Sequence, residues 1–433
     1  MMKRLIKRIN NKSATIGIIG LGYVGLPLVI RFMEEKFKVI GFDIDDEKCR
    51  KLNAGKSYIR HISGESIQLA LKNGFIATSN WNKIAEVDCM LICVPTPLGP
   101  NNTPDLKYIH STLKSIKKYL KKGQLLILES TTYPGTTEEE IVPEVEKNNF
   151  KIGTDFFIAY SPEREDPGNP NYSTRTIPKV VSGHTQNCCE VANSLYKCIV
   201  DETVTVSSTK VAEMTKLLEN IHRAVNIGLV NELKMVADKM DIDIFEVIKT
   251  AATKPFGFTP FYPGPGLGGH CIPIDPFYLT WKAKQVGVTT RFIELAGEVN
   301  TNMPQWVLEK AEIALLSKGK KISESKVLIL GMAYKKNVDD LRESPSLELI
   351  RLLSERGVDA DYHDFYIHKL HHTRKYSFDK SSINLKESIG NYDLVILSTD
   401  HDEYDYEYLQ KNSNLIVDTR GRFKRIFSNI ISA

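Results

Sequence analysis

The chain has 433 residues, of which 42% are hydrophobic and 25% charged, and its net charge is +4. This length allows two or three domains, and so small a charge does not indicate nucleic acid or a membrane surface as a partner. No apolar stretch approaches the roughly 20 residues that cross a bilayer, and the seven cysteines show no Cys-x-x-Cys spacing. We therefore predict three domains in a soluble, cytoplasmic protein.

The first part of the chain indicates a parallel sheet covered by helices. The basic start, residues 1–8, has no apolar core or cleavage site behind it and is predicted to be a frayed arm. Short apolar strands then alternate with helical stretches. The predicted strands are residues 14–19, 38–42, 89–94, 124–128 and 156–159.

A glycine motif, Gly20-Leu21-Gly22-Tyr23-Val24-Gly25, joins the first strand to a helical run. Its glycines let the backbone approach a pyrophosphate, and the start of the helix offers free amide donors to that anion. The second strand ends at Asp43, whose carboxylate can accept both ribose hydroxyls and repel a 2′-phosphate. This spacing favours NAD over NADP, and the alternative is an aspartate that only caps the next helix.

Two loops that follow predicted strands carry groups suited to catalysis. The segment 129–135 supplies hydroxyls at the carboxyl end of its strand, where doubly wound folds place ligands. The segment 160–168 contains Glu163, the carboxylate best placed to activate a water that hydrolyses a thioester. Turn formation is the alternative role for its acidic residues.

A long helix is predicted from Thr209 to Met240, because apolar residues recur there at steps of three and four. It links two lobes of the chain. Lys216, Asn220 and Arg223 fall on one face of this helix. An ammonium and an amide aimed at one point stabilise a developing alkoxide or oxyanion, and the alternative is a solvated polar stripe.

Cys271 lies in a segment of glycine and proline, residues 264–275, that a packing role does not explain. A cysteine can hold an aldehyde as a thiohemiacetal whose carbon still carries a transferable hydride. Together with the dinucleotide motif, this predicts two oxidations at one carbon. Asp275 is expected to orient a water or a lysine, and the alternative for Cys271 is a buried thiol at a turn.

The last section returns to strands and helices. The predicted strands are residues 326–331, 360–363, 394–398 and 415–417, with a helix over 345–356. The fold class is therefore α/β, with two Rossmann-like, doubly wound lobes joined by a long central helix and a helical middle domain.

Six motifs in this order resemble the UDP-glucose/GDP-mannose dehydrogenase family over nearly the whole chain. They are residues 20–28, 94–97, 129–136, 161–164, 213–220 and the Cys271 loop. The runs 253–264 and 291–298 look most like the branch that oxidises UDP-N-acetylhexosamines. Ile274 and His270 differ from the UDP-glucose branch, which has a lysine at the first position and lacks the histidine.

The resemblance implies residue roles that spacing alone does not give. The catalytic set would be Cys271 as nucleophile, Lys216 and Asn220 as oxyanion partners, Glu163 for thioester hydrolysis, and Thr131 and Asp275 assisting through water. The cofactor would lie on Gly20, Gly22, Tyr23, Val24, Gly25, Asp43, Lys48, Pro95, Thr96, Thr132 and Arg342. The UDP-sugar would lie on Glu163, Arg164, Lys216, Asn220, Arg223, Tyr262, Gly266, Tyr334, Lys335 and Arg420.

The resemblance also implies partners and boundaries. We expect an NAD-binding domain at 1–207, a helical dimerisation domain with the cysteine loop at 208–315, and a UDP-sugar-binding domain at 316–433. The expected assembly is a homodimer through the long helix. No metal, nucleic acid or membrane insertion is expected.

The expected reaction is oxidation of C6 of a UDP-N-acetylhexosamine, UDP-GlcNAc first, to the uronic acid with two NAD per turnover. UDP-GalNAc, UDP-ManNAc and UDP-glucose are the alternative substrates, and the product would feed a surface polysaccharide such as lipopolysaccharide. Two remoter alternatives are a two-electron hydroxy-acid dehydrogenase with a structural Cys271 and a nucleotide-sugar-binding regulator without turnover.

Overall fold

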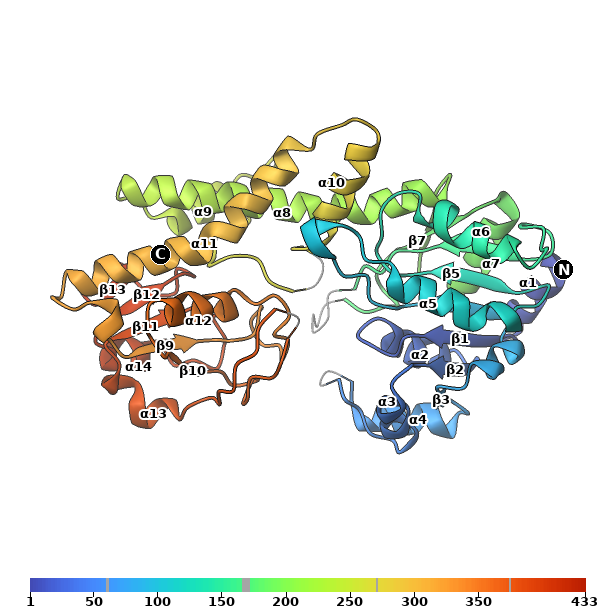
Figure 1. Cartoon of the computed structure of the whole chain (residues 1–433), viewed down its shortest axis with the longest axis horizontal. Coiled ribbons are helices and arrows are strands. Elements are labelled where there is room, and N and C mark those ends of the chain that lie inside the picture. The colour runs from blue at the N-terminus through green and yellow to red at the C-terminus, as the bar shows by residue number, and fades with distance from the viewer. Residues whose placement is uncertain (60–61, 166–171, 270–271, 374) are drawn as a thin grey trace. The chain divides into compact units, whose positions relative to one another are not determined.

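The structure is a computed structural model that describes residues 1–59, 62–165, 172–269, 272–373 and 375–433. The chain divides into two compact units. Residues 1–219 with 281–287 form the first unit, and residues 220–280 with 288–433 form the second. Figure 1 traces the chain from blue at the N-terminus to red at the C-terminus. The predicted boundaries near 207 and 315 stay predictions.

The first unit is built on an eight-stranded sheet in the described residues, with the order β3-β2-β1-β4-β5-β6-β7-β8. Neighbouring strands pair in parallel except β6 with β7. The strands are β1 Thr15–Ile19, β2 Lys38–Phe42, β3 Ile76–Thr78, β4 Cys89–Ile92, β5 Leu125–Leu128, β6 Phe157–Tyr160, β7 Lys179–Gly183 and β8 Thr203–Thr205. Its helices are α1 Met2–Asn10, α2 Gly25–Glu34, α3 Asp46–Asn53, α4 Gly64–Lys72, α5 Lys107–Ile116, α6 Val142–Glu146 and α7 Gln186–Tyr196.

The central strands of this sheet are buried along their whole length, as β1, β4, β5 and β6 show. Parallel strands covered by helices on both faces read as continuous apolar runs, which is why the sequence predicted them. The prediction missed β3, β7 and β8, of which β3 and β8 have only three residues each.

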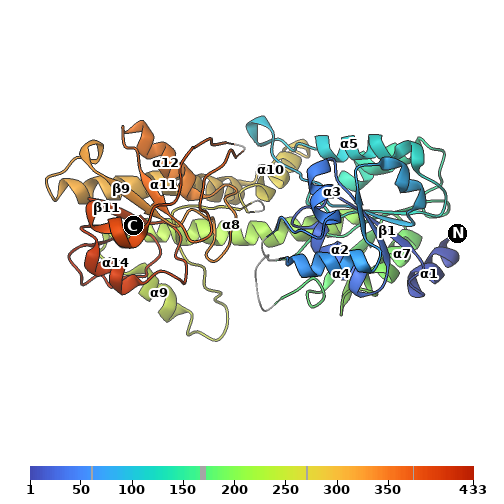
Figure 2. The same ribbon diagram turned by 90° about the horizontal axis from the view of Figure 1, so that it is seen from below.

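The N-terminal segment is a helix, so the predicted frayed arm is wrong. Leu5 and Ile9 of α1 are buried, and the helix lies beside α7 (Figure 2). Arg8 forms an ion pair with Asp88, whose other carboxylate oxygen accepts the N–H of Thr15 at 2.8 Å. The many basic residues made the segment look like a solvated arm, although its apolar residues lie on one face. Packing of this face against α7 stabilises the helix.

The second unit contains a five-stranded sheet in its described part, with the order β10-β9-β11-β12-β13 and parallel pairs throughout. The strands are β9 Val327–Leu330, β10 Asp361–His363, β11 Leu394–Leu397, β12 Ile416–Asp418 and β13 Ile430–Ser432. The helices that begin after residue 240 are α9 Ile244–Ala251, α10 Asp275–Gln285, α11 Arg291–Leu316, α12 Pro345–Glu355, α13 Leu385–Ser388 and α14 Tyr406–Asn412. Both sheets are doubly wound types, which confirms the predicted fold class.

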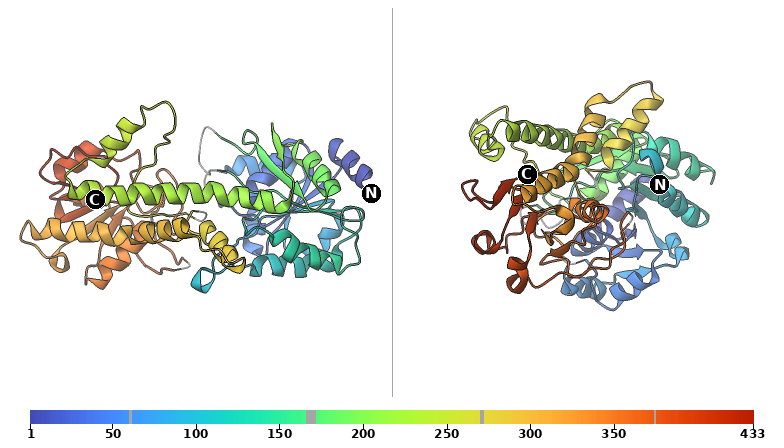
Figure 3. Two further views of the ribbon diagram at one scale, coloured as in Figure 1. Left: turned by 90° about the horizontal axis from the view of Figure 1, so that it is seen from above. Right: turned by 60° about the vertical axis from the view of Figure 1, so that its left-hand side comes forward.

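The predicted long helix is α8, Thr209–Lys239, one unbroken element of 31 residues (Figure 3). Alternating three- and four-residue apolar steps were enough to find it, because a helix of this length repeats its pattern many times. Within the described residues, no helix combines the length and apolarity that crossing a membrane requires.

Candidate functional site

The glycine motif after β1 forms a cradle that larger residues would fill. Gly20 has φ of +93°, and a Cβ there would lie 2.7 Å from the Cys93 carbonyl oxygen. A Cβ on Gly25 would lie 1.9 Å from the Gly20 carbonyl oxygen, whereas Gly22 faces open space. The helix α2 begins at Gly25 without a side-chain cap, so the positive end of its dipole is open to a pyrophosphate, while Leu26 donates its N–H to the Gly22 carbonyl at 3.0 Å and Pro27 has none.

Asp43 lies at the end of β2 beside this cradle. One of its carboxylate oxygens accepts the N–H of Leu21 at 3.0 Å and the other accepts the N–H of Asp45 at 3.0 Å. Because an ionised carboxylate offers about four lone-pair sites, two remain for the hydroxyls of a ribose. The alternative, that Asp43 only caps α3, does not hold, since the N-cap residue is Asp45.

The loop after β5 carries a second feature that fits a ligand. Thr132 is fully buried, and its hydroxyl has no hydrogen-bond partner among the described residues. A buried hydroxyl is rarely left unpaired, so this group is suited to bonding a bound molecule. Thr96 donates to the carbonyl of the half-buried Thr131 at 2.7 Å, which ties the two loops together. The residues of the cradle and of this loop fit NAD.

Glu213 of α8 anchors the same loop, and the sequence reasoning missed it. Its carboxylate accepts the N–H groups of Gly135 at 2.6 Å and Thr137 at 2.9 Å, and the Thr137 hydroxyl at 2.7 Å. Burial raises the pKa of Glu213 to about 7, against the effect of these hydrogen bonds. Its place in the motif 213–220 was the available signal, since a glutamate on an inward helix face needs a partner.

Glu163 and Arg164 occupy the loop after β6. Glu163 is half-buried, and one carboxylate oxygen accepts the N–H of Glu165 at 2.5 Å. Arg164 is held elsewhere, by an ion pair with Glu219 at 2.8 Å and a hydrogen bond to the Pro178 carbonyl at 2.7 Å. Its guanidinium therefore shapes the loop, and its predicted role toward a substrate stays a prediction.

The helix α8 carries Lys216, Asn220 and Arg223 one turn apart. Lys216 and Asn220 are buried, whereas Arg223 is exposed. In the second unit, Asn220 donates its amide to the carboxylate of Asp275 at 2.5 Å. Asp275 is the first residue of α10 and is 1% exposed. The structure thus brings together two predicted catalytic residues that lie 55 positions apart in the sequence.

The glycine segment before Cys271 lies against loops of the C-terminal sheet. A Cβ on Gly264 would lie 2.6 Å from Nη1 of Arg420, and one on Gly269 would lie 2.9 Å from the ring of Tyr334. The N–H of Gly269 donates to the carbonyl of Arg342 at 2.7 Å. The glycines therefore let the segment approach Arg420 and Tyr334, two predicted substrate contacts.

Asn231 of α8 fixes the start of this segment. Its amide oxygen accepts the N–H of Gly264 at 3.0 Å, and its amide nitrogen donates to Asn300 at 2.9 Å. Asn300 in turn donates to the Ala224 carbonyl at 3.0 Å. This chain of buried amides was not predicted, because an asparagine on a mostly apolar helix gives no sign of its partner.

The other predicted site residues differ in their exposure to solvent. Tyr262 and Pro95 are exposed, and Gly266 has φ of +134°. Half-buried residues are Tyr23, Val24, Lys48, Tyr334 and Lys335. Arg342 makes a bidentate ion pair with Asp340, at 2.7 Å for its shortest contact. Cys271 and His270 lie outside the described residues. In the described part of the chain, no group of three or more metal-ligating side chains is gathered.

A glycine cradle with an acidic strand end, and a second lobe that presents arginine and tyrosine to a glycine segment, define a dinucleotide-dependent enzyme of the α/β class. Three family models match the chain: the NAD binding domain of the UDP-glucose/GDP-mannose dehydrogenase family at 14–200, its central domain at 210–302 and its UDP binding domain at 328–425. The chain belongs to this family and is an NAD-dependent nucleotide sugar dehydrogenase.

Relatives within the family extend over almost the whole chain. The protein CapL of Staphylococcus aureus is 38% identical over 94% of this chain and 96% of its own length. The UDP-N-acetyl-D-glucosamine 6-dehydrogenase of Pseudomonas aeruginosa is 36% identical over 91% of this chain and 92% of its own. The solved UDP-D-ManNAc dehydrogenase of Pyrococcus horikoshii has a TM-score of 0.86 and 30% identity, over 96% of this chain and 98% of its own.

Proposed function

We propose that this enzyme oxidises C6 of a UDP-N-acetylhexosamine, UDP-GlcNAc first, to the uronic acid in two steps. The observation that carries the proposal is the Asn220–Asp275 pair next to a glycine segment, which fits a site that handles a charged oxygen. The Pseudomonas aeruginosa relative, named for UDP-N-acetyl-D-glucosamine, supports the choice of sugar. UDP-ManNAc is the second candidate, since relatives in Escherichia coli and Pyrococcus horikoshii are named for it.

Each predicted catalytic residue has one role in the proposed reaction. The ammonium of Lys216 and the amide of Asn220 stabilise the alkoxide and the later oxyanion, and Asp275 orients that amide. Cys271 adds to the aldehyde and holds the carbon through the second oxidation. Glu163 takes a proton from the water that releases the acid, with Thr131 assisting through water. When held by the glycine cradle and Asp43, NAD would supply the hydride acceptor for both oxidations.

A panel of UDP-sugars tests the substrate. We expect two NADH per uronic acid, with kcat/KM for UDP-GlcNAc about tenfold above those for UDP-GalNAc, UDP-ManNAc and UDP-glucose. A higher value for UDP-ManNAc would assign the second candidate instead. A yield of one NADH per substrate would favour the hydroxy-acid alternative, and no turnover at all would favour the regulator.

The thioester route is tested at Cys271. The variant Cys271→Ser is expected to form no uronic acid. Its hydroxyl is a weaker nucleophile than a thiol toward the aldehyde, and an oxygen ester is hydrolysed less readily than a thioester. Cys189→Ser, a half-exposed cysteine of α7, serves as the matched control and should keep the parent rate. Acid formation by Cys271→Ser at the parent rate would exclude the covalent mechanism.

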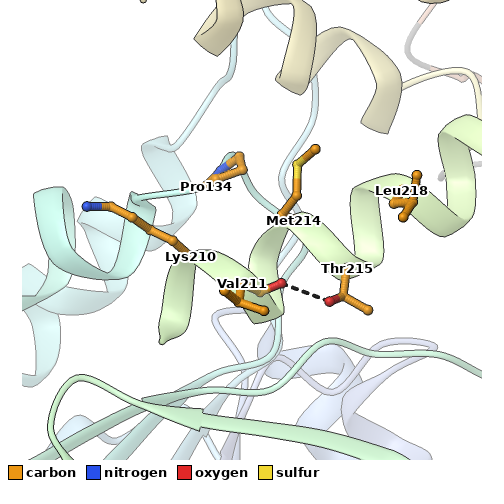
Figure 4. Close-up of a pocket in the computed structure, with 6 residues that line it drawn as sticks. All are labelled: Pro134, Lys210, Val211, Met214, Thr215 and Leu218. Carbon is orange, nitrogen blue, oxygen red and sulfur yellow. Dashed lines mark hydrogen bonds between the residues drawn. The ribbon is translucent and has the colours of Figure 1, made fainter. Parts of the chain in front are cut away.

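We also propose a homodimer formed through α8. Support comes from a stripe of exposed apolar side chains on one face of this helix, namely Val211, Met214, Leu218, Leu229, Leu233 and Val236. At its N-terminal end, Met214 and Leu218 line a pocket together with Pro134 (Figure 4). The variant Leu218→Glu should give a monomer by light scattering, whereas Val286→Glu, exposed at the end of α10, should not.

A cytoplasmic location is the remaining part of the proposal. Every cysteine that the structure describes is unpaired, which suits a reducing compartment. Fractionation of the source cells, with the uronic acid activity as marker, is expected to recover the enzyme in the cytoplasmic fraction.

A further inference from the structure

A buried ion pair lies beneath the loop that carries Glu163. Glu129 follows β5 and is fully buried, and Lys179, 5% exposed, begins β7. The ammonium of Lys179 donates to Oε2 of Glu129 at 2.6 Å. Tyr196, at the end of α7, donates its hydroxyl to the other oxygen of Glu129. Both oxygens of the carboxylate are therefore used, and the lysine is fixed in place.

The same ammonium faces Glu163. Its nitrogen lies 3.8 Å from Oε2 of Glu163, and this oxygen is buried without a hydrogen-bond partner among the described residues. The other oxygen of Glu163 accepts the N–H of Glu165 at 2.5 Å. The carboxylate is thus held at one oxygen, while the second has a cation nearby and a vacant lone pair.

Charge in this cluster is unbalanced. Three carboxyl groups, those of Glu129, Glu163 and Glu165, surround one lysine, and the buried thiol of Cys93 lies nearby. Burial and the neighbouring Glu163 raise the pKa of Glu165 to about 8. Burial by itself would lower the pKa of Lys179, but Glu129 and Glu163 hold it above its usual value.

We propose that Lys179 is a positioning residue for thioester hydrolysis: fixed by Glu129 and Tyr196, its ammonium stabilises the carboxylate form of Glu163 and directs that oxygen toward water. The inference rests on the proposed role of Glu163. In the step itself, Glu163 takes a proton from water, the water oxygen bonds to the acyl carbon, and the carbon–sulfur bond breaks. The sulfur leaves with the electron pair and takes up the proton from Glu163.

Removing the lysine alone would leave Glu129 buried without a counter-ion, so the test uses the double variant Glu129→Gln/Lys179→Met. With UDP-GlcNAc and NAD in rapid mixing, we expect an undiminished burst of two NADH per active site. Steady-state kcat should then fall about tenfold with KM unchanged, and intact-protein mass spectrometry should find the uronyl adduct on the enzyme.

A variant that preserves the charge distinguishes positioning from general damage. Lys179→Arg keeps the charge and should restore hydrolysis to within about threefold of the parent. Lys122→Met removes an exposed ion pair of the same unit, with Asp155, and should change nothing.

Because the double variant changes two buried positions of the first unit, Tyr196→Phe provides a second probe that leaves both of them intact. It removes only the hydroxyl that fixes Glu129 and should slow hydrolysis about two- to fivefold without changing the burst. A parent steady-state rate without adduct in folded variants would overturn the inference, as would equal losses in the burst and in hydrolysis. If Glu163→Gln itself accumulates no adduct, the proposed function is wrong instead.

Discussion

The two nucleotide-fold lobes use the same strand ends for different purposes. In each lobe the first strand leads into a glycine with positive φ, Gly20 or Gly331, and the second strand ends at an aspartate, Asp43 or Asp364. Each aspartate accepts N–H groups from the loop that follows the first strand: Asp43 from Leu21 and Asp364 from Met332 and Ala333. The backbone framework is therefore shared.

The difference lies in what else the carboxylate binds. Asp364 is 1% exposed and also accepts from the N–H groups of Tyr366 at 2.7 Å and Ile367 at 3.0 Å, and from His401 at 2.9 Å. These five donors exceed the four lone-pair sites of a carboxylate, so Asp364 has none left for a ribose. Burial alone would raise the pKa of Asp364, yet the hydrogen bond from His401 and the backbone donors hold it below its usual value.

The anion sites also differ. In the first lobe α2 begins at Gly25, directly behind the glycine motif, and offers its amide dipoles. In the second lobe the next helix, α12, begins only at Pro345, and the intervening loop carries Tyr334, Lys335 and Arg342. One lobe thus offers a helix start to a pyrophosphate, whereas the other presents side chains. The two lobes therefore share a backbone framework set by the order of their strands, whereas their loops determine which ligand each can bind.

The largest change is expected in the free energy of unfolding of the variant Asp364→Asn. An amide there places its own N–H groups against backbone donors, which should cost about 2–4 kcal/mol in the free energy of unfolding. Hydrogen exchange over residues 327–370 during urea unfolding measures this loss. The exposed Asp379→Asn is the control. A variant as stable as the parent would show that Asp364 is not structural.

Buried lysines extend the comparison, since Lys179 donates to the carboxylate of Glu129, whereas Lys234 donates to the backbone oxygens of Thr419 and Ala433. Burial lowers the pKa of Lys234 to about 7, although Asp418 opposes this. Between about pH 7 and pH 10 the folded state binds fewer protons than the unfolded chain, so its stability rises with pH by up to ~1.4 kcal/mol per unit.

Urea unfolding at pH 7, 8 and 9 should detect this rise in the second unit and its absence in Lys234→Met. The variant keeps every charged group that faces Lys234, and these groups provide the internal control. They are Asp238, Lys310, Asp418 and Arg420. An equal slope in both proteins would mean that Lys234 keeps its proton throughout.

The variant Asp43→Asn tests the corresponding aspartate of the first lobe. The loss of charge should reduce the preference for NAD over NADP about tenfold in kcat/KM, since repulsion of the 2′-phosphate disappears. Stability should fall by less than in Asp364→Asn, because only one of the two backbone N–H groups that Asp43 accepts would face the new amide nitrogen. The exposed Asp46→Asn is the control. An unchanged cofactor ratio would separate Asp43 from ribose recognition.

The smallest expected effect is that of Gly264→Ala. The added methyl group would meet Nη1 of Arg420 at 2.6 Å and displace the guanidinium. We expect KM for the UDP-sugar to rise about three- to tenfold with KM for NAD unchanged. Gly390→Ala adds a methyl group with only ordinary contact, 3.7 Å from the Asn412 carbonyl, and serves as control. Equal rises for both substrates would contradict a lobe-specific role.

Sequence reasoning located most of the fold and part of the site. It found the eleven elements with strong periodicity or apolar runs, such as β2, α8 and α12, within one or two residues of their ends. It missed α1, because a helix with charged residues on most faces looks like a solvated arm until α7 covers Leu5 and Ile9. It also missed Glu213, whose partners are a loop 76 to 78 positions away.

Residues close together in the chain specify the glycine cradle, the aspartate after the second strand, the long helix and the motifs of the family. Which buried charges are compensated depends instead on contacts between distant segments. Lys179 meets Glu129 across 50 positions, and Asp364 meets His401 across 37. Such pairs depend on which strand ends and loops become neighbours in a sheet, and no local pattern of residues encodes that.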